Sequence, residues 1–219
     1  MRFLLPLLFG LVGAAVLIWL GLWQLDRLTW KKGVLAEIET RIAAAPGPVP
    51  LAPDPEADRF RPVTVVGQLA GPPLRVLGAW REGGTGYRIV APLALGERRV
   101  LVDLGVVPFQ PGEVMLPQGP LEIIGNLDWP DDVNSGTPEP DGTTWFGRDT
   151  PAMAAALGTE PVMIVARHVT PQAEPRPIPV GTQGIPNNHL GYAIQWFGLA
   201  VVWLGMTAFL LWRMTRRTV

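Results

Sequence analysis

Histidine offers the widest range of chemistry among the residue types of this 219-residue chain, and the sequence holds only two. His189 stands in the stretch NNHLGYAIQW, directly before a long apolar run, whereas His168 falls within a strand-like pattern. A neutral imidazole can ligate a metal, transfer a proton or make a structural hydrogen bond. Because cysteine is absent, no thiolate can act as ligand or nucleophile. His189 is therefore the first candidate for a ligand-binding side chain.

No catalytic constellation accompanies the histidines. The sequence contains no G-x-S-x-G motif, and its only serine is Ser135, in a loop rich in glycine and proline. The acidic residues around that serine are expected to be solvated. They are Asp131, Asp132, Glu139 and Asp141. This pattern disfavours an enzyme, including one anchored in a membrane.

Two apolar runs without charged residues occupy positions 3–23 and 190–212. A helix rises ~1.5 Å per residue, so either run can cross a hydrocarbon core of ~30 Å. The first run is longer than the apolar region of about 7–15 residues that is usual in a signal peptide. It also continues into a segment with helical periodicity. The sequence therefore predicts a membrane protein with transmembrane helices at 1–23 and 189–212.

The charges at the ends of these runs indicate their orientation. Three arginines with no acidic residue among them follow the second run: Arg213, Arg216 and Arg217. Positive residues favour the cytoplasmic side, and long loops cross a membrane largely regardless of their charge. We therefore expect both termini, including a basic tail at 213–219, in the cytoplasm and residues 24–189 outside it. With a net charge of −1 and no basic face, nucleic acid is not an expected partner.

The segment between the spans divides by composition. Leu28, Leu35 and Ile42 recur every seven residues, which predicts a helical stalk at 24–45 that ends before Pro46. Segments 46–58 and 170–188 are rich in proline and are typical of semi-rigid tethers.

Between the tethers, residues 59–169 are predicted to form a periplasmic β domain. Apolar and polar residues alternate in six segments, which we expect to be strands: 61–69, 73–80, 87–95, 98–107, 121–129 and 161–169. One short helix is expected at 151–157, with Asp149 or Thr150 as its N-cap and Gly158 at its end. The predicted fold is mainly β, of α+β composition, as a small antiparallel barrel or sandwich flanked by two transmembrane helices.

Polar and aromatic residues gather where both spans reach the outer membrane surface. Trp23, Gln24 and Arg27 end the first span, and His189 and Tyr192 begin the second. Antiparallel helices would bring these residues to one level, although an ordinary aromatic belt would account for the aromatic ones. In the second span, Gly191, Gly198 and Gly205 and the series His189, Trp196 and Trp203 occupy nearly opposite faces.

We expect the glycine face of the second span to pack on the small residues of the first, because small residues allow close helix contact. Those small residues are Gly10, Ala14 and Gly21. The face of His189 would then point outward, toward lipid, another membrane protein or a flat apolar ligand.

Three motifs, GLWQLDRLTWKK, VLVDLGVVP and PNNHLGYAIQWFGLA, resemble the surfeit locus protein 1 family of cytochrome c oxidase assembly factors. The resemblance extends over essentially the whole chain. One position departs from the family pattern, because Val106 stands where the family usually has tryptophan. The compact length is typical of a bacterial member, which implies a location in the bacterial inner membrane.

The resemblance implies a role in building haem–copper oxidase, in particular the haem a centres of its largest subunit, with haem a synthase as a further partner. It implies haem a as the cofactor and His189 as the ligand of the haem iron, a role that suits an imidazole. Arg27 would pair with a haem propionate or, alternatively, with lipid phosphate. Trp23, Gln24, Tyr192 and Trp196 would complete the site.

Two hypotheses remain open on the sequence alone. In one, the protein is a non-enzymatic assembly factor that holds haem a. In the other, it is a structural membrane partner that stabilises the oxidase subunit without binding haem, and His189 makes a structural or partner contact.

Overall fold

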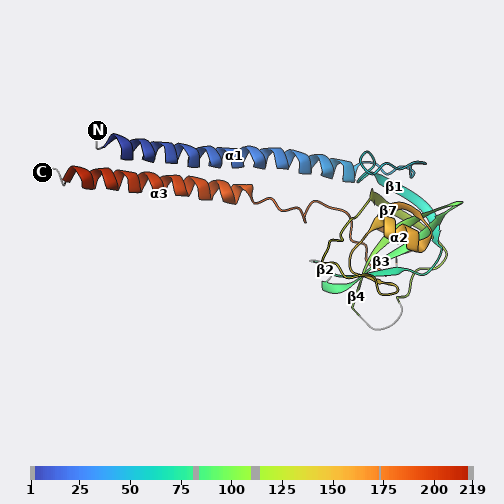
Figure 1. Ribbon diagram of the computed structural model, residues 1–219. Coiled ribbons are helices and arrows are strands. Elements are labelled where there is room, and N and C mark those ends of the chain that lie inside the picture. The colour runs from blue at the N-terminus through green and yellow to red at the C-terminus, as the bar shows by residue number, and fades with distance from the viewer. Residues whose placement is uncertain (1–2, 81–83, 110–113, 173, 217–219) are drawn as a thin grey trace. The chain divides into compact units, whose positions relative to one another are not determined.

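The computed structural model describes residues 3–80, 84–109, 114–172 and 174–216 (Figure 1). The chain forms two compact units. One consists of both ends of the chain, Met1–Glu37 with Thr182–Val219, and the other is Ile38–Gly181.

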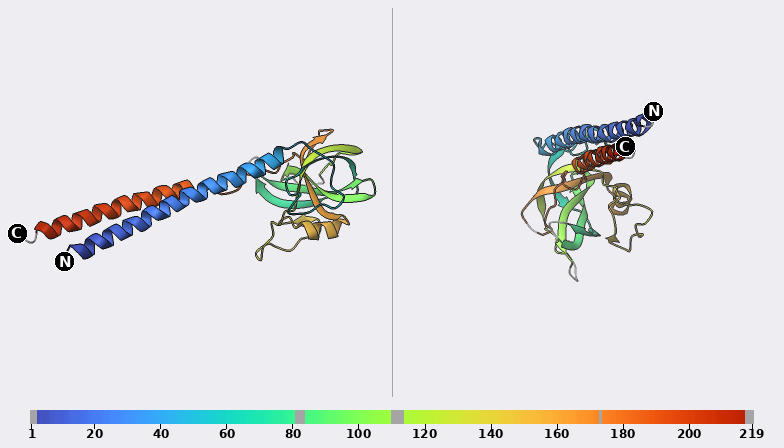
Figure 2. Two further views of the ribbon diagram at one scale, coloured as in Figure 1. Left: turned by 90° about the horizontal axis from the view of Figure 1, so that it is seen from above. Right: turned by 90° about the vertical axis from the view of Figure 1, so that its left-hand side faces the viewer.

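The first unit is a pair of antiparallel helices. Helix α1 (Leu4–Ala43) runs through the first apolar segment without a break, and helix α3 (His189–Arg216) contains the second. Both are long and apolar enough to cross a membrane, and they lie side by side in every view (Figures 1 and 2). Apolar side chains on their outer faces are exposed, such as Leu5 at 77% and Val201 at 70%, as expected for contact with lipid. The predicted pair of membrane helices is confirmed.

The prediction that the glycine face of α3 packs on α1 is wrong. Gly191, Gly198 and Gly205 have no neighbouring atom within 4 Å of a hypothetical Cβ, so they face away from α1. The buried residues of α1 are those expected, Gly10, Ala14 and Gly21.

Large side chains of α3 occupy the space that the small residues of α1 leave. Phe197 packs on Gly21, and Trp203 packs on Gly13 while its indole Nε1 donates to the Gly10 carbonyl at 3.0 Å. The helices therefore meet large against small, a complementarity that fills space better than two facing rows of glycine. As a result, the face of α3 that carries His189, Trp196 and Trp203 points toward α1.

The second unit is built on a seven-stranded mixed sheet. Its strands are β1 (Pro62–Leu69), β2 (Leu74–Trp80), β3 (Gly84–Leu95), β4 (Arg98–Pro108), β5 (Pro120–Asp128), β6 (Thr144–Trp145) and β7 (Glu160–Thr170). The order is β1-β5-β7-β4-β3-β2-β6, and β1 also pairs with β3 through Gln68–Ala94 and Leu69–Leu93. This extra pairing closes β1, β5, β7, β4 and β3 into a barrel, which confirms the barrel alternative of the predicted fold.

Two features of the sheet differ from the prediction. Strands β4 and β7 are parallel, as are β2 and β6, whereas a fully antiparallel barrel was expected. Parallel neighbours need a long crossover connection, and the chain between β4 and β7 supplies one that includes helix α2 (Thr150–Leu157). Strand β6 was not predicted, because two residues are too few to show an alternating pattern.

Helix α2 has the ends that the sequence predicts. The Asp149 side chain accepts a hydrogen bond from the Ala152 amide at 3.0 Å, Pro151 lies in the first turn, and Gly158 closes the helix at a φ of 64°.

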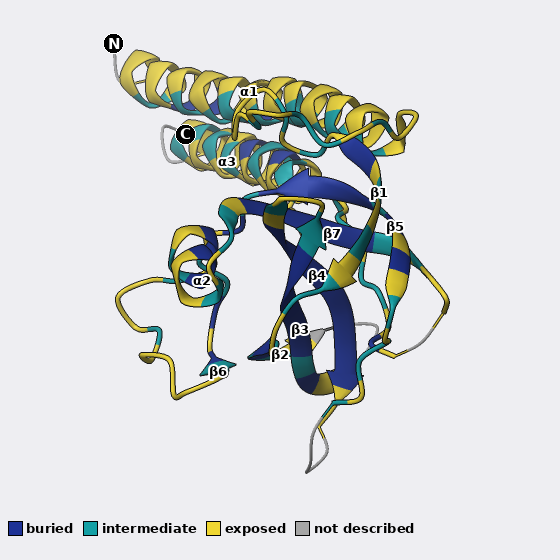
Figure 3. Ribbon diagram, turned by 90° about the vertical axis from the view of Figure 1, so that its right-hand side faces the viewer, coloured by how far each residue is buried: buried dark blue, intermediate teal, exposed yellow. Residues whose placement is uncertain are grey.

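The core of this unit has two parts. One fills the barrel with the side chains of residues such as Ile89, Leu93, Leu121, Ile123 and Ile164. The other lies between α2 and the sheet and contains Met153 and Met163. The inward strands appear as the buried ribbons of Figure 3. Since the chain has no cysteine, this apolar packing takes the place of disulfides.

Both proline-rich segments make backbone contacts with the barrel. Gly47 pairs with Val63 of β1, and Arg176 exchanges two hydrogen bonds with Val106 of β4 at 2.8 and 2.9 Å. The Gly105 backbone passes so close to the Arg176 carbonyl that a Cβ atom there would lie 1.9 Å from its oxygen. These segments are therefore part of the compact unit rather than free spacers along their whole length.

Candidate functional site

The residues with the most distinctive chemistry meet where α3 begins. His189 is the first residue of α3, and its ring Nδ1 lies 2.8 Å from the side-chain oxygen of Gln24 on α1. Both side chains are half-buried. Gln24 follows Gly10 by fourteen residues and Gly21 by three, so it lies on the face of α1 that contacts α3. The two residues are 165 positions apart in the sequence.

The hydrogen bond determines what the imidazole can do. With the Gln24 oxygen as acceptor, Nδ1 carries the ring proton and donates it, and Nε2 keeps a lone pair. Metal-binding histidines usually donate the ring N–H that is not used for ligation to an acceptor that orients the ring. At His189, the side-chain oxygen of Gln24 stands where such an acceptor would be, at Nδ1.

The segment that leads into α3 is also attached to α1. The Lys31 ammonium group, seven residues after Gln24, donates to the carbonyl of Pro186. The Tyr192 amide donates to the Asn188 carbonyl at 3.2 Å, which forms the first turn of α3. The sequence analysis did not predict the Lys31 contact. The feature that could have revealed it is the position of Lys31 on the same helix face as Gln24.

Arg27 follows Gln24 by three residues on α1, but its side chain is exposed whereas that of Gln24 is half-buried. Its guanidinium carbon is 5.8 Å from the ring centre of Trp23 and 5.0 Å from that of Trp30, both within reach of a cation–π contact. All three side chains are exposed. They form a cationic and aromatic surface on α1, beside the pair formed by His189 and Gln24.

The two remaining candidates on α3 differ in exposure. Trp196 is half-buried and follows His189 by seven residues, so both lie on the α1-facing side of the helix. Tyr192 is 50% exposed. The arrangement thus combines one imidazole held by a hydrogen bond with one half-buried and several exposed aromatic side chains.

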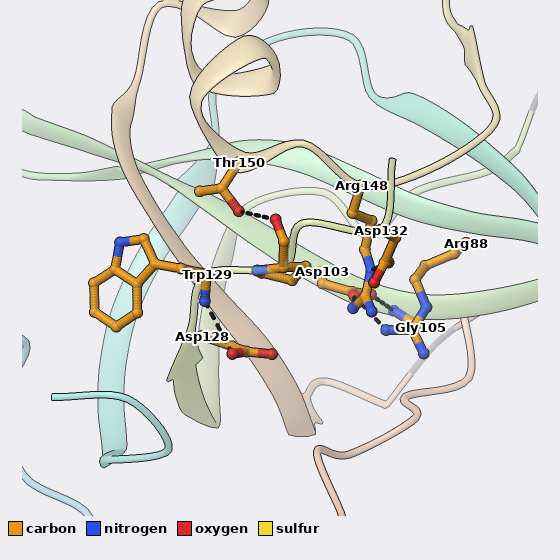
Figure 4. A network of polar contacts seen from close by, with 9 residues as sticks. Arg88, Asp103, Gly105, Asp128, Trp129, Asp132, Arg148 and Thr150 are labelled. Atoms are coloured by element: carbon orange, nitrogen blue, oxygen red, sulfur yellow. Dashed lines mark hydrogen bonds and ion pairs between the residues drawn. The ribbon is translucent and has the colours of Figure 1, made fainter. Parts of the chain in front are cut away.

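The β domain holds a group of buried charges that the sequence did not predict (Figure 4). The fully buried Asp103 carboxylate accepts from Arg88 at 2.5 Å and from Arg148 at 3.3 Å, and its other oxygen accepts from the Gly105 amide at 3.0 Å. Arg148 also donates to Asp132 at 2.6 Å. Asp132 therefore has a specific partner, in contrast to the solvated loop expected for it.

Electrostatics favour the charged form of the Arg148 guanidinium. Burial lowers the pKa of the Arg148 guanidinium, but the carboxylates of Asp103 and Asp132 outweigh that effect, and its pKa is raised overall. The group joins strand β4 to the loop before α2, and its carboxylates are engaged by donors. Its geometry is that of a structural contact. The signal available in the sequence was an aspartate in the middle of the apolar strand VLVDLGVV.

His168 is exposed on β7, where it is opposite Ile124 of β5. No group of three or more histidine, cysteine, aspartate or glutamate side chains that could hold a metal ion occurs in the part of the chain that the structure describes. A site at His189 would therefore have to bind a metal that brings most of its own ligands.

Comparisons with known proteins identify the family. A family model described as the SURF1 family matches residues 11–201, a range that includes Gln24 and His189. Surfeit locus protein 1 of Rattus norvegicus is 30% identical, with 82% of this chain and 67% of that protein covered. The Homo sapiens protein of the same name is 31% identical, with coverages of 83% and 69%. A SURF1-like protein of Drosophila melanogaster is 28% identical, with coverages of 89% and 72%. The chain therefore belongs to the SURF1 family.

Proposed function

We propose that this protein is a non-enzymatic assembly factor for haem–copper cytochrome c oxidase, and that it holds haem a for the largest subunit of the oxidase. Membership of the SURF1 family supports the assembly role. The observation that carries the haem part is the His189 imidazole, whose Nδ1 is bonded to Gln24 at 2.8 Å. An imidazole is a common axial ligand of haem iron, and one held by a second residue needs little rearrangement to bind.

The residues around His189 fit a porphyrin. Nε2 of His189 would bind the iron, while Trp196, Tyr192 and Trp23 would offer apolar surface to the macrocycle. Arg27 is an exposed cation that would pair with a propionate. When bound, haem a supplies the redox-active iron that the oxidase needs, and this chain would only bind, orient and shield it.

The proposal places the protein in the bacterial inner membrane, with both termini in the cytoplasm and the β domain in the periplasm. The arginines at the end of α3 support this orientation, since Arg213 and Arg216 lie in its last turn. The end of the helix pair that bears His189 would then lie at the outer membrane surface. There it could meet the largest oxidase subunit and haem a synthase within the bilayer.

The test is an absorption spectrum of the full-length protein purified from cells that make haem a. The wild-type protein should carry haem a, and His189→Ala should insert at normal abundance and lose most of it. His168→Ala is the matched control, because it removes the other histidine from an exposed position on β7. It should keep the full haem content.

Two results would contradict the proposal. Full haem content in His189→Ala would show that His189 is not the ligand. A colourless wild-type protein that still copurifies with the largest oxidase subunit would favour a structural partner that never touches haem.

A further inference from the structure

The contact between His189 and Gln24 joins polar side chains of two helices, whereas elsewhere in the described pair side chains of α3 lie on small residues of α1. On α1 the neighbouring contact positions are Gly10, Gly13 and Gly21, which receive side chains of α3. Gln24 is thus the place where an amide oxygen faces an imidazole nitrogen at hydrogen-bond distance. The bond is part-buried, so water competes with it less than with a bond on an open surface.

From this geometry we infer that Gln24 is a positioning residue: it fixes the tautomer of His189 so that Nδ1 carries the proton and Nε2 is the ligand atom. The inference rests on the proposed function as far as haem is concerned. In free histidine the neutral ring favours the opposite tautomer, with the proton on Nε2. Without the Gln24 acceptor, the lone pair would therefore move to Nδ1, which lies close to the backbone and is the less accessible nitrogen.

The bond also restricts the ring. Donation from Nδ1 to a fixed acceptor holds the plane of the imidazole and makes Nε2 more basic, and both effects favour metal ligation. Loss of such a second partner typically weakens metal binding about 10–100-fold. We expect a loss of that size in haem affinity when the Gln24 oxygen is removed.

Two substitutions at Gln24 separate the role of its amide oxygen as acceptor from that of its amide nitrogen as donor. Gln24→Leu removes the acceptor and leaves an apolar side chain that is one atom shorter. Gln24→Glu keeps an oxygen acceptor and removes the amide donor. If Gln24 acts as the acceptor, the glutamate variant should retain the Nδ1–H tautomer and much of the haem affinity, whereas the leucine variant should lose both.

Trp203→Phe provides the matched control. It removes a second hydrogen bond between the helices, from the Trp203 indole to the Gly10 carbonyl at 3.0 Å, and leaves His189 and Gln24 intact. If Gln24→Leu acts only by weakening the helix packing, Trp203→Phe should change the His189 tautomer and the haem affinity in the same way. If Gln24→Leu acts on His189 specifically, Trp203→Phe should keep the wild-type tautomer and affinity.

The measurement uses the full-length chain in lipid nanodiscs with a His168→Gln substitution, so that His189 is the single histidine. Nitrogen-15 NMR of the labelled imidazole, at a pH where the ring is neutral, reports which nitrogen carries the proton in the haem-free protein. A titration of the same samples with haem a gives the affinity.

We expect the Nδ1–H tautomer in the wild type, Gln24→Glu and Trp203→Phe, and its loss in Gln24→Leu together with about 10–100-fold weaker haem binding. An Nε2–H ring in the wild type would overturn the inference, as would an unchanged tautomer and affinity in Gln24→Leu. If the tautomer depends on Gln24 but no variant binds haem, the positioning role of Gln24 stands and the proposed function fails.

Discussion

Two polar side chains, Asp103 in the β domain and His189 in the helix pair, differ in how far their hydrogen-bonding atoms are engaged. In the β domain, Asp103 is fully buried and accepts from two arginines and a backbone amide, so its hydrogen-bonding capacity is largely used. In the helix pair, the described contacts engage only Nδ1 of His189 and give no second partner to the ring. The Asp103 carboxylate is engaged by its neighbours and holds the fold together, whereas the His189 ring keeps a nitrogen that could serve a ligand. The comparison therefore separates structure from candidate function within one chain.

The largest effect should follow from removing the Asp103 carboxylate. Asp103→Ala leaves Arg88 and Arg148 in the interior without their shared carboxylate, and removal of one partner of a buried charge group costs about 3–5 kcal/mol. The free energy of unfolding of the β domain should fall by that amount in denaturant titrations of the full chain. Asp132→Ala removes a half-exposed carboxylate and should cost no more than about 1 kcal/mol. Equal losses in both variants would show that burial does not distinguish the two carboxylates.

An intermediate effect should follow from disturbing the contact between the helices. A side chain at Gly21 would overlap the Phe197 ring, since a Cβ atom there lies 2.6 Å from it, and overpacking of this kind costs about 1–3 kcal/mol. Gly21→Leu should therefore push α1 and α3 apart. Gly198→Leu adds the same side chain where no atom lies within 4 Å and should have no effect on the contact.

The distance between spin labels on introduced cysteines measures this separation without interference, because the chain has no cysteine of its own. If Gly198→Leu separates the helices and Gly21→Leu does not, the glycine face of α3 contacts α1 after all.

The smallest effect concerns an ion pair on the surface of the β domain. A hydrogen bond from Arg98 lowers the pKa of the Glu160 carboxyl, whose oxygens accept from the guanidinium at 2.8 and 2.7 Å. Because the folded pKa is depressed, the stabilisation is present above the unfolded pKa and is lost as the pH falls through the folded pKa. The pair is partly exposed, so its contribution is about 0–1 kcal/mol.

Glu160→Gln should therefore be less stable than the wild type at neutral pH by no more than that amount, and the two should converge in acid. Thermal melts at neutral and acidic pH provide the comparison. A difference that grows on acidification would have the wrong sign for a depressed carboxyl pKa.

Much of the fold could be predicted because it depends on local patterns. Alternation located the six longer strands, and the cap residues Asp149 and Gly158 located α2. The parallel pairing of β4 with β7 could not be predicted, since it depends on which strands meet in space rather than on any local pattern. The two-residue strand β6 was too short to leave a signal.

The candidate site was predictable in its members but not in their contacts. Gln24 ends the first predicted span and His189 begins the second, so both were expected at the same level of the membrane. The side of α3 that faces α1 was predicted wrongly. Glycine and tryptophan both recur every seven residues in α3, so their spacing does not show which of the two faces contacts α1. Only the fit of Phe197 and Trp203 over small residues of α1 decides between them.

We propose that His189, oriented by Gln24, ligates the iron of haem a through Nε2. Pulsed electron paramagnetic resonance of the haem-loaded protein tests it most directly, in a His168→Gln background that leaves His189 as the only histidine and carries nitrogen-15 in that ring alone. The account predicts a strong hyperfine coupling between the iron and the labelled imidazole nitrogen. Bound haem a without that coupling would contradict it.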